Sequence, residues 1–92
     1  MDIVFTPHGW GDFVYWLEND STTAVRIKEL LKAIQQDPFK GIGKPEALKH
    51  DLKGWWSRRI TGEDRLVYRV TGTKGIDQRC IVIQCRMHYD DK

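Results

Sequence analysis

The sequence has only two cysteines and three prolines, and it has no hydrophobic run near the ~20 residues that a membrane-spanning helix needs. Its 92 residues include 15 basic and 13 acidic side chains, so the net charge is only +2. Hydrophobic residues make up 40% and charged residues 30%, a balance typical of globular rather than disordered proteins. A chain of this length predicts one domain over residues 1–92, with hardly any room for an enclosed cofactor cavity.

The two cysteines exclude a disulfide framework. Cys80 and Cys85 fall in one strand-like run, five residues apart. An extended chain would place them on opposite faces and about 16 Å apart, too far for a disulfide. The N-terminus, Met1–Ile3, lacks the basic and long apolar stretches of a secretory signal. We therefore expect a cytoplasmic protein with reduced, buried thiols and no membrane partner.

The basic residues are concentrated between positions 40 and 69. This segment holds eight Lys and Arg against four acidic residues, a net charge of +4, which leaves −2 for the rest of the chain. The basic residues are Lys40, Lys44, Lys49, Lys53, Arg58, Arg59, Arg65 and Arg69. Such a segment indicates either a local site for a polyanion or an ordinary solvated surface, and charge alone leaves both open.

Hydrophobic periodicity predicts an α+β fold of the order β-α-α-β-β-β. Residues 2–6 form a short strand, and Thr6 followed by Pro7 suits a helix cap and first helical position. Two apolar helical stripes follow, at Trp10, Phe13, Val14 and Leu17, and at Ile27, Leu30, Leu31 and Ile34. Pro38 ends the second helix. After a polar stretch with a possible helical turn at residues 46–48, strands are expected at 55–61, 65–71 and 79–89. The two helices would pack on a small antiparallel sheet.

Alternation along the strands predicts which side chains share a face. The apolar sides are Leu66, Tyr68 and Val70 in one strand, and Ile81, Ile83, Cys85 and Met87 in the last. If the helices cover these sides, Arg65 and His88 face the same open surface. The residues expected beside them are Trp55, Ser57 and Arg59.

This open face would carry the groups needed for metal-free RNA cleavage. Glu46 comes from the preceding loop, Arg59 and Arg65 from a hairpin, and His88 and Tyr89 from the last strand. A base can remove the proton of a ribose 2′-OH, an acid can protonate the departing 5′-oxygen, and guanidinium groups can stabilise the phosphorane. Taken alone, these residues indicate only a basic α+β domain that could bind RNA.

Four strings in the chain resemble a known family. They are KPEALKH at 44–50, WSRRI at 56–60, RLVY at 65–68 and CRMHY at 85–89. With Glu63 and the two helices, they are similar to the YoeB (Txe/YoeB) toxins of the RelE-like superfamily of bacterial toxin–antitoxin modules. The resemblance covers nearly the whole chain. It implies a microbial-RNase-like fold and an endoribonuclease that needs no cofactor, acts in the A site of the 70S ribosome and cuts mRNA.

The resemblance also implies roles for individual residues. Glu46 would be the general base, His88 the general acid and Arg65 the group that stabilises the transition state. Tyr89 would help to place the scissile nucleotide, and Glu63 would orient an arginine. The residues expected to line the phosphate path are Lys49, His50 and Arg59. No metal site is expected, because the histidines and Glu46 show no familiar ligand spacing.

The family further implies a protein partner. Its antitoxins resemble YefM, with a DNA-binding half and an acidic disordered tail that folds on the toxin. Operator DNA would therefore be reached only through the antitoxin. Toxin homodimers also occur in the family, and the region of Trp10, Tyr15 and Trp16 could contribute to one.

The sequence differs from the family pattern at residues 90–92 and at Met87, and two alternative functions accompany this interpretation. Residues 90–92, Asp-Asp-Lys, extend beyond the terminal His-Tyr pair of many relatives and could repel phosphate or lie clear of it. Met87 replaces a residue that is frequently aromatic and is expected to face the core. Toxins resembling ParE share the fold and bind DNA gyrase without a ribonuclease centre, although Glu46, Arg65 and His88 together argue against that reading. A plain RNA-binding module is the other alternative.

Overall fold

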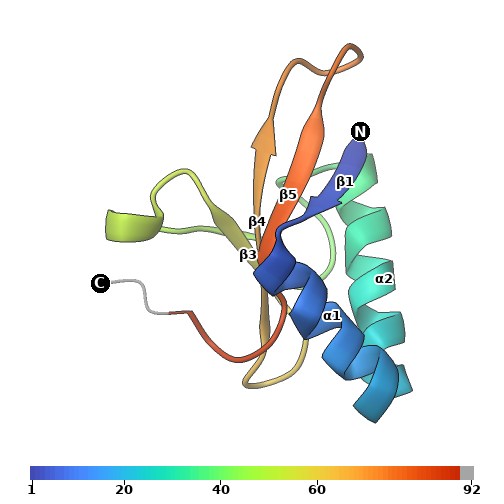
Figure 1. Ribbon diagram of the computed structural model, residues 1–92. Helices are drawn as coiled ribbons and strands as arrows, with labels where there is room; N and C mark the ends of the chain where they lie inside the picture. Colours follow the sequence, from blue (N-terminus) through green and yellow to red (C-terminus); the bar gives the residue numbers. More distant parts are fainter. Residues whose placement is uncertain (90–92) are drawn as a thin grey trace.

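Two helices lie along one face of a five-stranded sheet in the computed structural model, which describes residues 1–89 (Figure 1). The elements are β1 (Asp2–Phe5), α1 (Pro7–Asn19), α2 (Ser21–Gln36), β2 (Glu46–Ala47), the 3-10 helix η1 (His50–Leu52), β3 (Trp56–Arg59), β4 (Arg65–Thr71) and β5 (Arg79–Gln84). The predicted α+β fold with two N-terminal helices is confirmed.

The strands lie in the order β1-β5-β4-β3-β2. Strands β3 to β5 pair antiparallel as expected; β2 adds to β3 antiparallel and β1 joins the edge of β5 in parallel, so the sheet is mixed. Residues 46–47 form the short edge strand β2 rather than a helical turn, because Glu46 pairs with Ser57 and the Leu48 N–H donates to the Trp55 carbonyl at 2.9 Å.

Side-chain caps fix where the helices begin. The Thr6 hydroxyl accepts a hydrogen bond from the Gly9 N–H at 3.1 Å, and Pro7 occupies the first turn of α1. The Asp20 carboxylate accepts from the Thr23 N–H at 3.2 Å and from its hydroxyl at 2.8 Å. These bonds lower the pKa of Asp20, because they stabilise the ionised cap. The two helices therefore turn sharply at Asp20 and lie on the same face of the sheet (Figure 1).

The core lies between α2 and the helix-facing side of the sheet. It includes Ile27, Leu30 and Ile34 from α2, and Leu66, Tyr68, Cys80 and Val82 from the strands, all fully buried. Burial of each large aliphatic side chain stabilises the fold by about 1.5–3 kcal/mol. These contacts hold both helices on one face of the sheet.

The predicted faces of β5 were wrong. Cys80 and Val82 face the helices, because they pair with Val70 and Tyr68, whereas Ile81 lies opposite the exposed Arg69. Both alternating sets in β5 are apolar, so alternation could not choose between them. The strand ends at Gln84, and Cys85 is buried in the same core as Cys80 rather than on the other face. Burial raises the pKa of both thiols to about 12.

One member of the basic segment lies inside the protein. Arg58 is 0% exposed, and its guanidinium donates to the Ile42 carbonyl at 3.1 Å, the Asp37 carbonyl at 2.7 Å and the Lys40 carbonyl at 2.9 Å. Its Nε donates to the Tyr68 hydroxyl at 3.1 Å. Arg58 therefore fastens the loop that follows α2 to the sheet, and it is not part of a polyanion surface.

Candidate functional site

The face of the sheet away from the helices brings the predicted base and arginines together. Glu46 pairs with Ser57 across β2 and β3, and Arg59 is the next residue of β3 on the same face as Ser57. Arg59 in turn pairs directly with Arg65 at the start of β4. Glu46, Arg59 and Arg65 thus lie on one face of three adjacent strands, as the sequence predicted.

The loop before Glu46 is held in place from the core side. The carbonyl of Gly43 accepts a hydrogen bond from the Arg59 N–H at 2.7 Å. Gly43 has a φ of 87°, and a Cβ at this position would lie 2.7 Å from Leu30 Cδ2. Only glycine fits this approach to α2 without displacement of a core side chain. Together with the Arg58 contacts, it fixes the direction in which residues 44–46 reach the edge of the sheet.

Two arginines on directly opposite positions give the site its charge. Like charges at such positions are unfavourable unless an anion lies between them. Arg65 is half-buried, and its Nη1 donates to the carbonyls of Thr61, Gly62 and Asp64 at 3.0, 3.3 and 3.1 Å. These three contacts orient the Arg65 guanidinium beside the exposed Arg59, an arrangement suited to a phosphate group.

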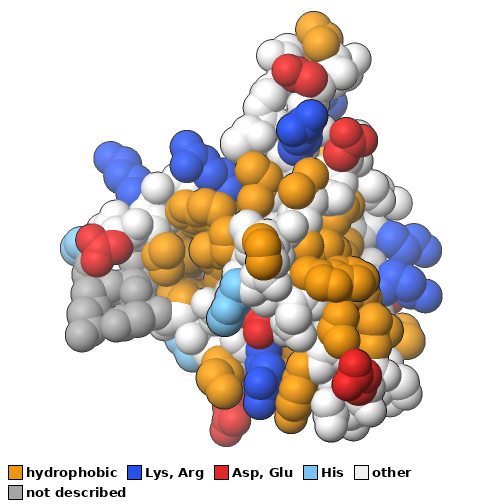
Figure 2. Space-filling view, in the orientation of Figure 1, with side chains coloured by type: hydrophobic (Ala, Val, Ile, Leu, Met, Phe, Trp, Pro, Cys, Tyr) orange, Lys and Arg blue, Asp and Glu red, His pale blue; other side chains and the backbone are white. Residues whose placement is uncertain are grey.

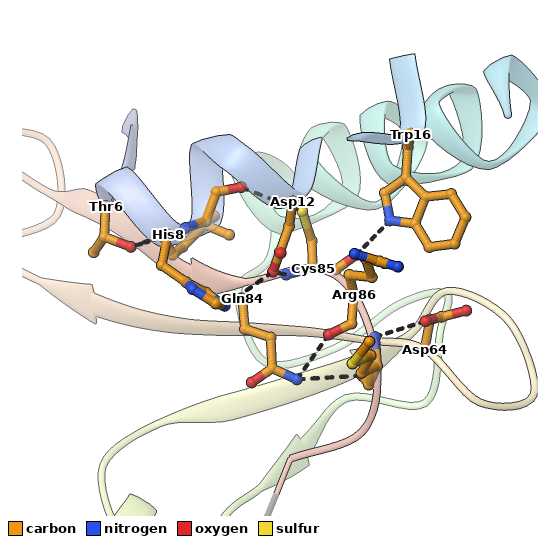
Figure 3. A network of polar contacts seen from close by, with 11 residues as sticks. Thr6, His8, Asp12, Trp16, Asp64, Gln84, Cys85 and Arg86 are labelled. Atoms are coloured by element: carbon orange, nitrogen blue, oxygen red, sulfur yellow. Dashed lines mark hydrogen bonds and ion pairs between the residues drawn. The ribbon is translucent and has the colours of Figure 1, made fainter. Parts of the chain in front are cut away.

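The segment after β5 is clamped by polar contacts (Figure 3). The Cys85 N–H donates to the Asp12 carboxylate at 3.0 Å, and the Cys85 carbonyl accepts from the Trp16 indole N–H at 2.7 Å. The Gln84 amide donates to the Arg86 carbonyl at 3.1 Å. The Arg86 guanidinium lies 3.6 Å from the centre of the Tyr15 ring. Helix α1 therefore holds the segment that leads to His88.

A second set of contacts joins this segment to the turn between β3 and β4. The Met87 N–H donates to Asp64 Oδ1 at 2.6 Å, and the Met87 carbonyl accepts from the Arg65 N–H at 3.0 Å. Met87 has a φ of 67°, a left-handed conformation that costs about 1–2 kcal/mol for a residue with a side chain. It is 60% exposed, so the expectation that Met87 faces the core was wrong, since the chain leaves the strand after Gln84.

The chain after β5 runs on the side of the sheet away from the helices (Figure 1), and His88 and Tyr89 follow the turn at Met87. His88 is exposed and Tyr89 is half-buried, and their ring centres are 4.8 Å apart. His88 Nδ1 lies 3.1 Å from the Tyr89 carbonyl, which can only accept a hydrogen bond. In this contact Nδ1 carries the proton, so Nε2 is the nitrogen left for proton exchange with a substrate.

The other predicted residues lie around this face. His50 begins η1 with a φ of 55°, Lys49 precedes it, and both side chains are exposed. Figure 1 places η1 on the same side of the sheet as the chain after β5. Glu63 is exposed in the β3–β4 turn, and its orienting role stays a prediction. The Asp-Asp-Lys extension at 90–92 lies outside the described residues.

The described part of the chain contains no metal-binding cluster. Within residues 1–89, no three His, Cys, Asp or Glu side chains are close enough together to hold a metal ion. In the same range, neither helix combines the length and the apolar character needed to cross a bilayer.

Comparison with known proteins agrees with the resemblance in the four strings. Residues 5–89 match the family model described as YoeB-like toxin of bacterial type II toxin-antitoxin system. The chain belongs to this family. It is 51% identical to the toxin YoeB of Streptomyces coelicolor over 97% of this chain and 100% of that protein.

Solved structures of YoeB toxins have the same fold. The YoeB/ParE toxin from Agrobacterium tumefaciens gives a TM-score of 0.93 at 48% identity, over 97% of this chain and 100% of the other. YoeB from Staphylococcus aureus gives 0.85 at 41% identity as a dimer, and 0.84 at 40% in a heterotetrameric complex with YefM, covering 97% of this chain and 98% of the other in both. The family and the α+β fold predicted from the sequence are confirmed.

Sequence reasoning missed the residues that hold the terminal segment. Asp12 and Trp16 lie on α1 outside the predicted apolar stripe; Trp16 was considered only as part of a region that could contribute to a homodimer, and Asp12 and Asp64 were assigned no role. Their partners are backbone groups at positions 85 and 87, far away in the sequence. No spacing rule predicts such contacts, because they depend on how α1 and the turn meet the end of β5.

Proposed function

We propose that this protein is the toxin of a type II toxin–antitoxin module and that it cuts mRNA in the ribosomal A site without a metal or cofactor. The observation that carries the proposal is the pairing of Arg59 with Arg65 on the face that also holds Glu46. The backbone bond between Arg65 and Met87 joins the segment that precedes His88 to the start of β4, which supports the same proposal. Membership of the YoeB-like toxin family supports the same activity.

In the proposed reaction, Glu46 accepts the proton of a ribose 2′-OH while the 2′-oxygen attacks the adjacent phosphorus. The bond from phosphorus to the 5′-oxygen breaks, and His88 Nε2 donates its proton to that oxygen. The products are a 2′,3′-cyclic phosphate and a free 5′-OH, so atoms and charge balance without an added reactant. DNA lacks the nucleophile and would not be cut.

The arginines supply the electrostatic part of the mechanism. Charge accumulates on the non-bridging oxygens of the phosphorane, and an oriented guanidinium stabilises it more than the ground state. Because three backbone carbonyls already orient Arg65, little reorganisation is needed when the phosphate binds. Arg59, Lys49 and His50 would guide the backbone of the RNA, and Tyr89 would stack on the scissile nucleotide.

We further propose that a YefM-like antitoxin neutralises the protein in the bacterial cytoplasm. The YoeB–YefM complex from Staphylococcus aureus supports this partner, and the YoeB dimer from the same organism supports homodimer formation. Figure 2 shows hydrophobic side chains gathered over β1 and the start of α1, and Trp10 in that region is 51% exposed. Trp16 instead points its indole N–H at Cys85, so Trp10 is the better candidate for a contact between copies.

The test is cleavage of mRNA bound to ribosomes by the purified protein. We expect the parent to cut in the A site, and Glu46→Gln, Arg65→Ala and His88→Gln to lose about 10²-fold or more while still binding the antitoxin. Glu29→Gln, an exposed carboxylate on α2, is the matched control and should cut like the parent.

A chemical control separates the proposed reaction from other nucleases. An mRNA with a single 2′-deoxyribose at the cleavage position should resist the protein, since the attacking oxygen is missing. Cleavage of that mRNA, or full activity of His88→Gln, would contradict the mechanism. Growth arrest with intact mRNA and inhibited gyrase would favour the ParE-like binding inhibitor instead.

A further inference from the structure

The Asp64 carboxylate links two parts of the chain that the proposed reaction needs together. Its Oδ1 accepts the Met87 N–H at 2.6 Å, and its Oδ2 accepts the Thr61 hydroxyl at 2.7 Å. The first bond reaches the segment that carries His88, and the second anchors Asp64 in the turn between β3 and β4. Figure 3 shows Asp64 on that turn, joined to the chain just after Arg86.

The same turn also orients Arg65. The carbonyl of Asp64 accepts from Arg65 Nη1 at 3.1 Å, while the Arg65 N–H donates to the Met87 carbonyl at 3.0 Å. Asp64 thus binds the N–H of Met87 and Arg65 binds its carbonyl, and Met87 is the residue directly before His88. A shift of the turn would move the guanidinium and the imidazole together, and loss of the Asp64 carboxylate would break its bonds to both the Met87 N–H and the Thr61 hydroxyl.

The backbone conformation of Met87 is the reason why a carboxylate is suited to position 64. The φ of 67° at Met87 is unfavourable for any residue other than glycine. Met87 is also 60% exposed, so core packing does not hold it in this conformation. A charged acceptor makes a shorter and stronger hydrogen bond to a backbone N–H than a neutral one. The bond to Asp64 therefore stabilises the turn that directly precedes His88.

We propose that Asp64 is a positioning residue for the ribonuclease reaction: it holds the Met87 turn so that His88 lies at a fixed place beside Arg65. This inference rests on the proposed function. Asp64 does not touch the RNA or exchange a proton with it. It acts through His88, because a displacement of the acid by about 1 Å is enough to slow a proton transfer by about 10²-fold.

The test compares two aspartates that are alike except in what they hold. Asp77 also lies in a hairpin turn and accepts a backbone N–H, that of Thr73, at 2.7 Å, but its turn joins β4 and β5 at the other end of the sheet (Figure 1). We expect Asp64→Ala to lower kcat by about 10- to 100-fold with KM within about twofold of the parent. Asp77→Ala, with the same change of charge, should keep the parental kcat.

Two further variants separate positioning from stability. Asp64→Asn keeps an oxygen that accepts the Met87 N–H but loses the acceptor for the Thr61 hydroxyl, which already accepts the N–H groups of Glu63 and Asp64, so it should recover part of the lost rate. In a His88→Gln background, Asp64→Ala should lower the residual single-turnover rate no further, because residues that act as a unit are not additive. Equal losses in Asp64→Ala and Asp77→Ala, a parental kcat in Asp64→Ala, or an undiminished effect in the His88→Gln background would each overturn the inference.

Amide hydrogen exchange distinguishes failure of this inference from failure of the proposed function. The Met87 N–H should exchange about tenfold faster in Asp64→Ala than in the parent and should be unchanged in Asp77→Ala. If the parent cuts no RNA, the proposed function and the catalytic consequence of Asp64 both fall, while faster exchange would still establish the tether itself. If the parent cuts RNA and Met87 exchange does not respond to Asp64→Ala, only the positioning role is refuted.

Discussion

Arg58 and Arg59 are neighbours in β3, and we predict that their replacement has different effects. Loss of Arg58 should lower stability, whereas loss of Arg59 should lower the cleavage rate. Arg58 is fully buried and donates four hydrogen bonds, three of them to carbonyls of the loop after α2. Arg59 is exposed, and its side chain lies opposite Arg65 on the open face. Replacing each by methionine removes the same charge and leaves a side chain of similar length.

The expected loss at Arg58 follows from the contacts. Hydrogen bonds from a charged donor contribute about 1.5–3 kcal/mol each, and the buried guanidinium itself costs several kcal/mol of desolvation, which methionine recovers. We therefore expect Arg58→Met to lower the free energy of unfolding by about 3–5 kcal/mol. For a chain of this size, at about 0.05–0.15 kcal/mol per residue, that is a large part of the total. The melting temperature should fall by about 15–30 °C.

The expected result at Arg59 is the reverse. Arg59→Met should change the free energy of unfolding by no more than about 0.5 kcal/mol, because the lost side chain is exposed and faces a like charge. The cleavage rate of Arg59→Met should fall, since a cation that we propose to bind phosphate is gone. Urea titrations followed by tryptophan fluorescence, with cleavage assayed well below each midpoint, measure both quantities.

The reasoning would be refuted by either of two results. One is a free energy of unfolding for Arg58→Met within about 1 kcal/mol of the parent, which would mean that the carbonyl contacts do not hold the loop. The other is a loss of stability in Arg59→Met as large as in Arg58→Met. Arg58→Lys gives an intermediate case, because one ammonium group cannot reach Tyr68 and all three carbonyls together.

Two more predictions concern the packing of the fold. Gly9→Ala should lower the free energy of unfolding by about 1–3 kcal/mol, because the new Cβ would collide with the Val82 carbonyl. Gly11→Ala should raise it by about 0.5–1 kcal/mol, because nothing lies within 4 Å of the new Cβ. Melting curves that do not separate the two variants would contradict this prediction. Cys80 and Cys85 should not react with a thiol reagent at neutral pH without unfolding. Because burial raises the pKa of both thiols to about 12 from 9.0, the unfolded chain loses these protons first. Stability should then fall as pH rises from about 9 to 12, by at most about 1.4 kcal/mol per pH unit for each thiol, and a Cys80→Ala, Cys85→Ala double variant should show a shallower fall.

The helices and the site strands could be predicted from local signals. The stripe of Ile27, Leu30 and Ile34 and the Thr6-Pro7 start are properties of neighbouring residues, so they persist whatever the rest of the chain does. The approach of Arg59 to Arg65 followed from a hairpin with a short turn, which fixes the pairing of its strands, whereas the pairing of Glu46 with Ser57 in β2 was not predicted.

The predictions failed where the local pattern was ambiguous. In β5 every residue from Cys80 to Ile83 is apolar, so period-2 alternation had no polar side to distinguish, and the pairing with β4 decided the faces. Arg58 and Arg59 alternate along β3 and so lie on opposite faces, but only the position of the loop after α2 determined that Arg58 is enclosed by carbonyls.

By itself, the sequence determined the order of the elements, the family, and the identity of the groups available for chemistry, because each of these is written in short strings or short-range periodicity. The tertiary structure alone decided which face of β5 is buried, which arginine supports the fold, and how the residues before His88 are held. Those outcomes depend on backbone groups of distant segments that meet only when the sheet and α1 are assembled. Backbone N–H and carbonyl groups are the same at every position, and so their partners cannot be read from residue types.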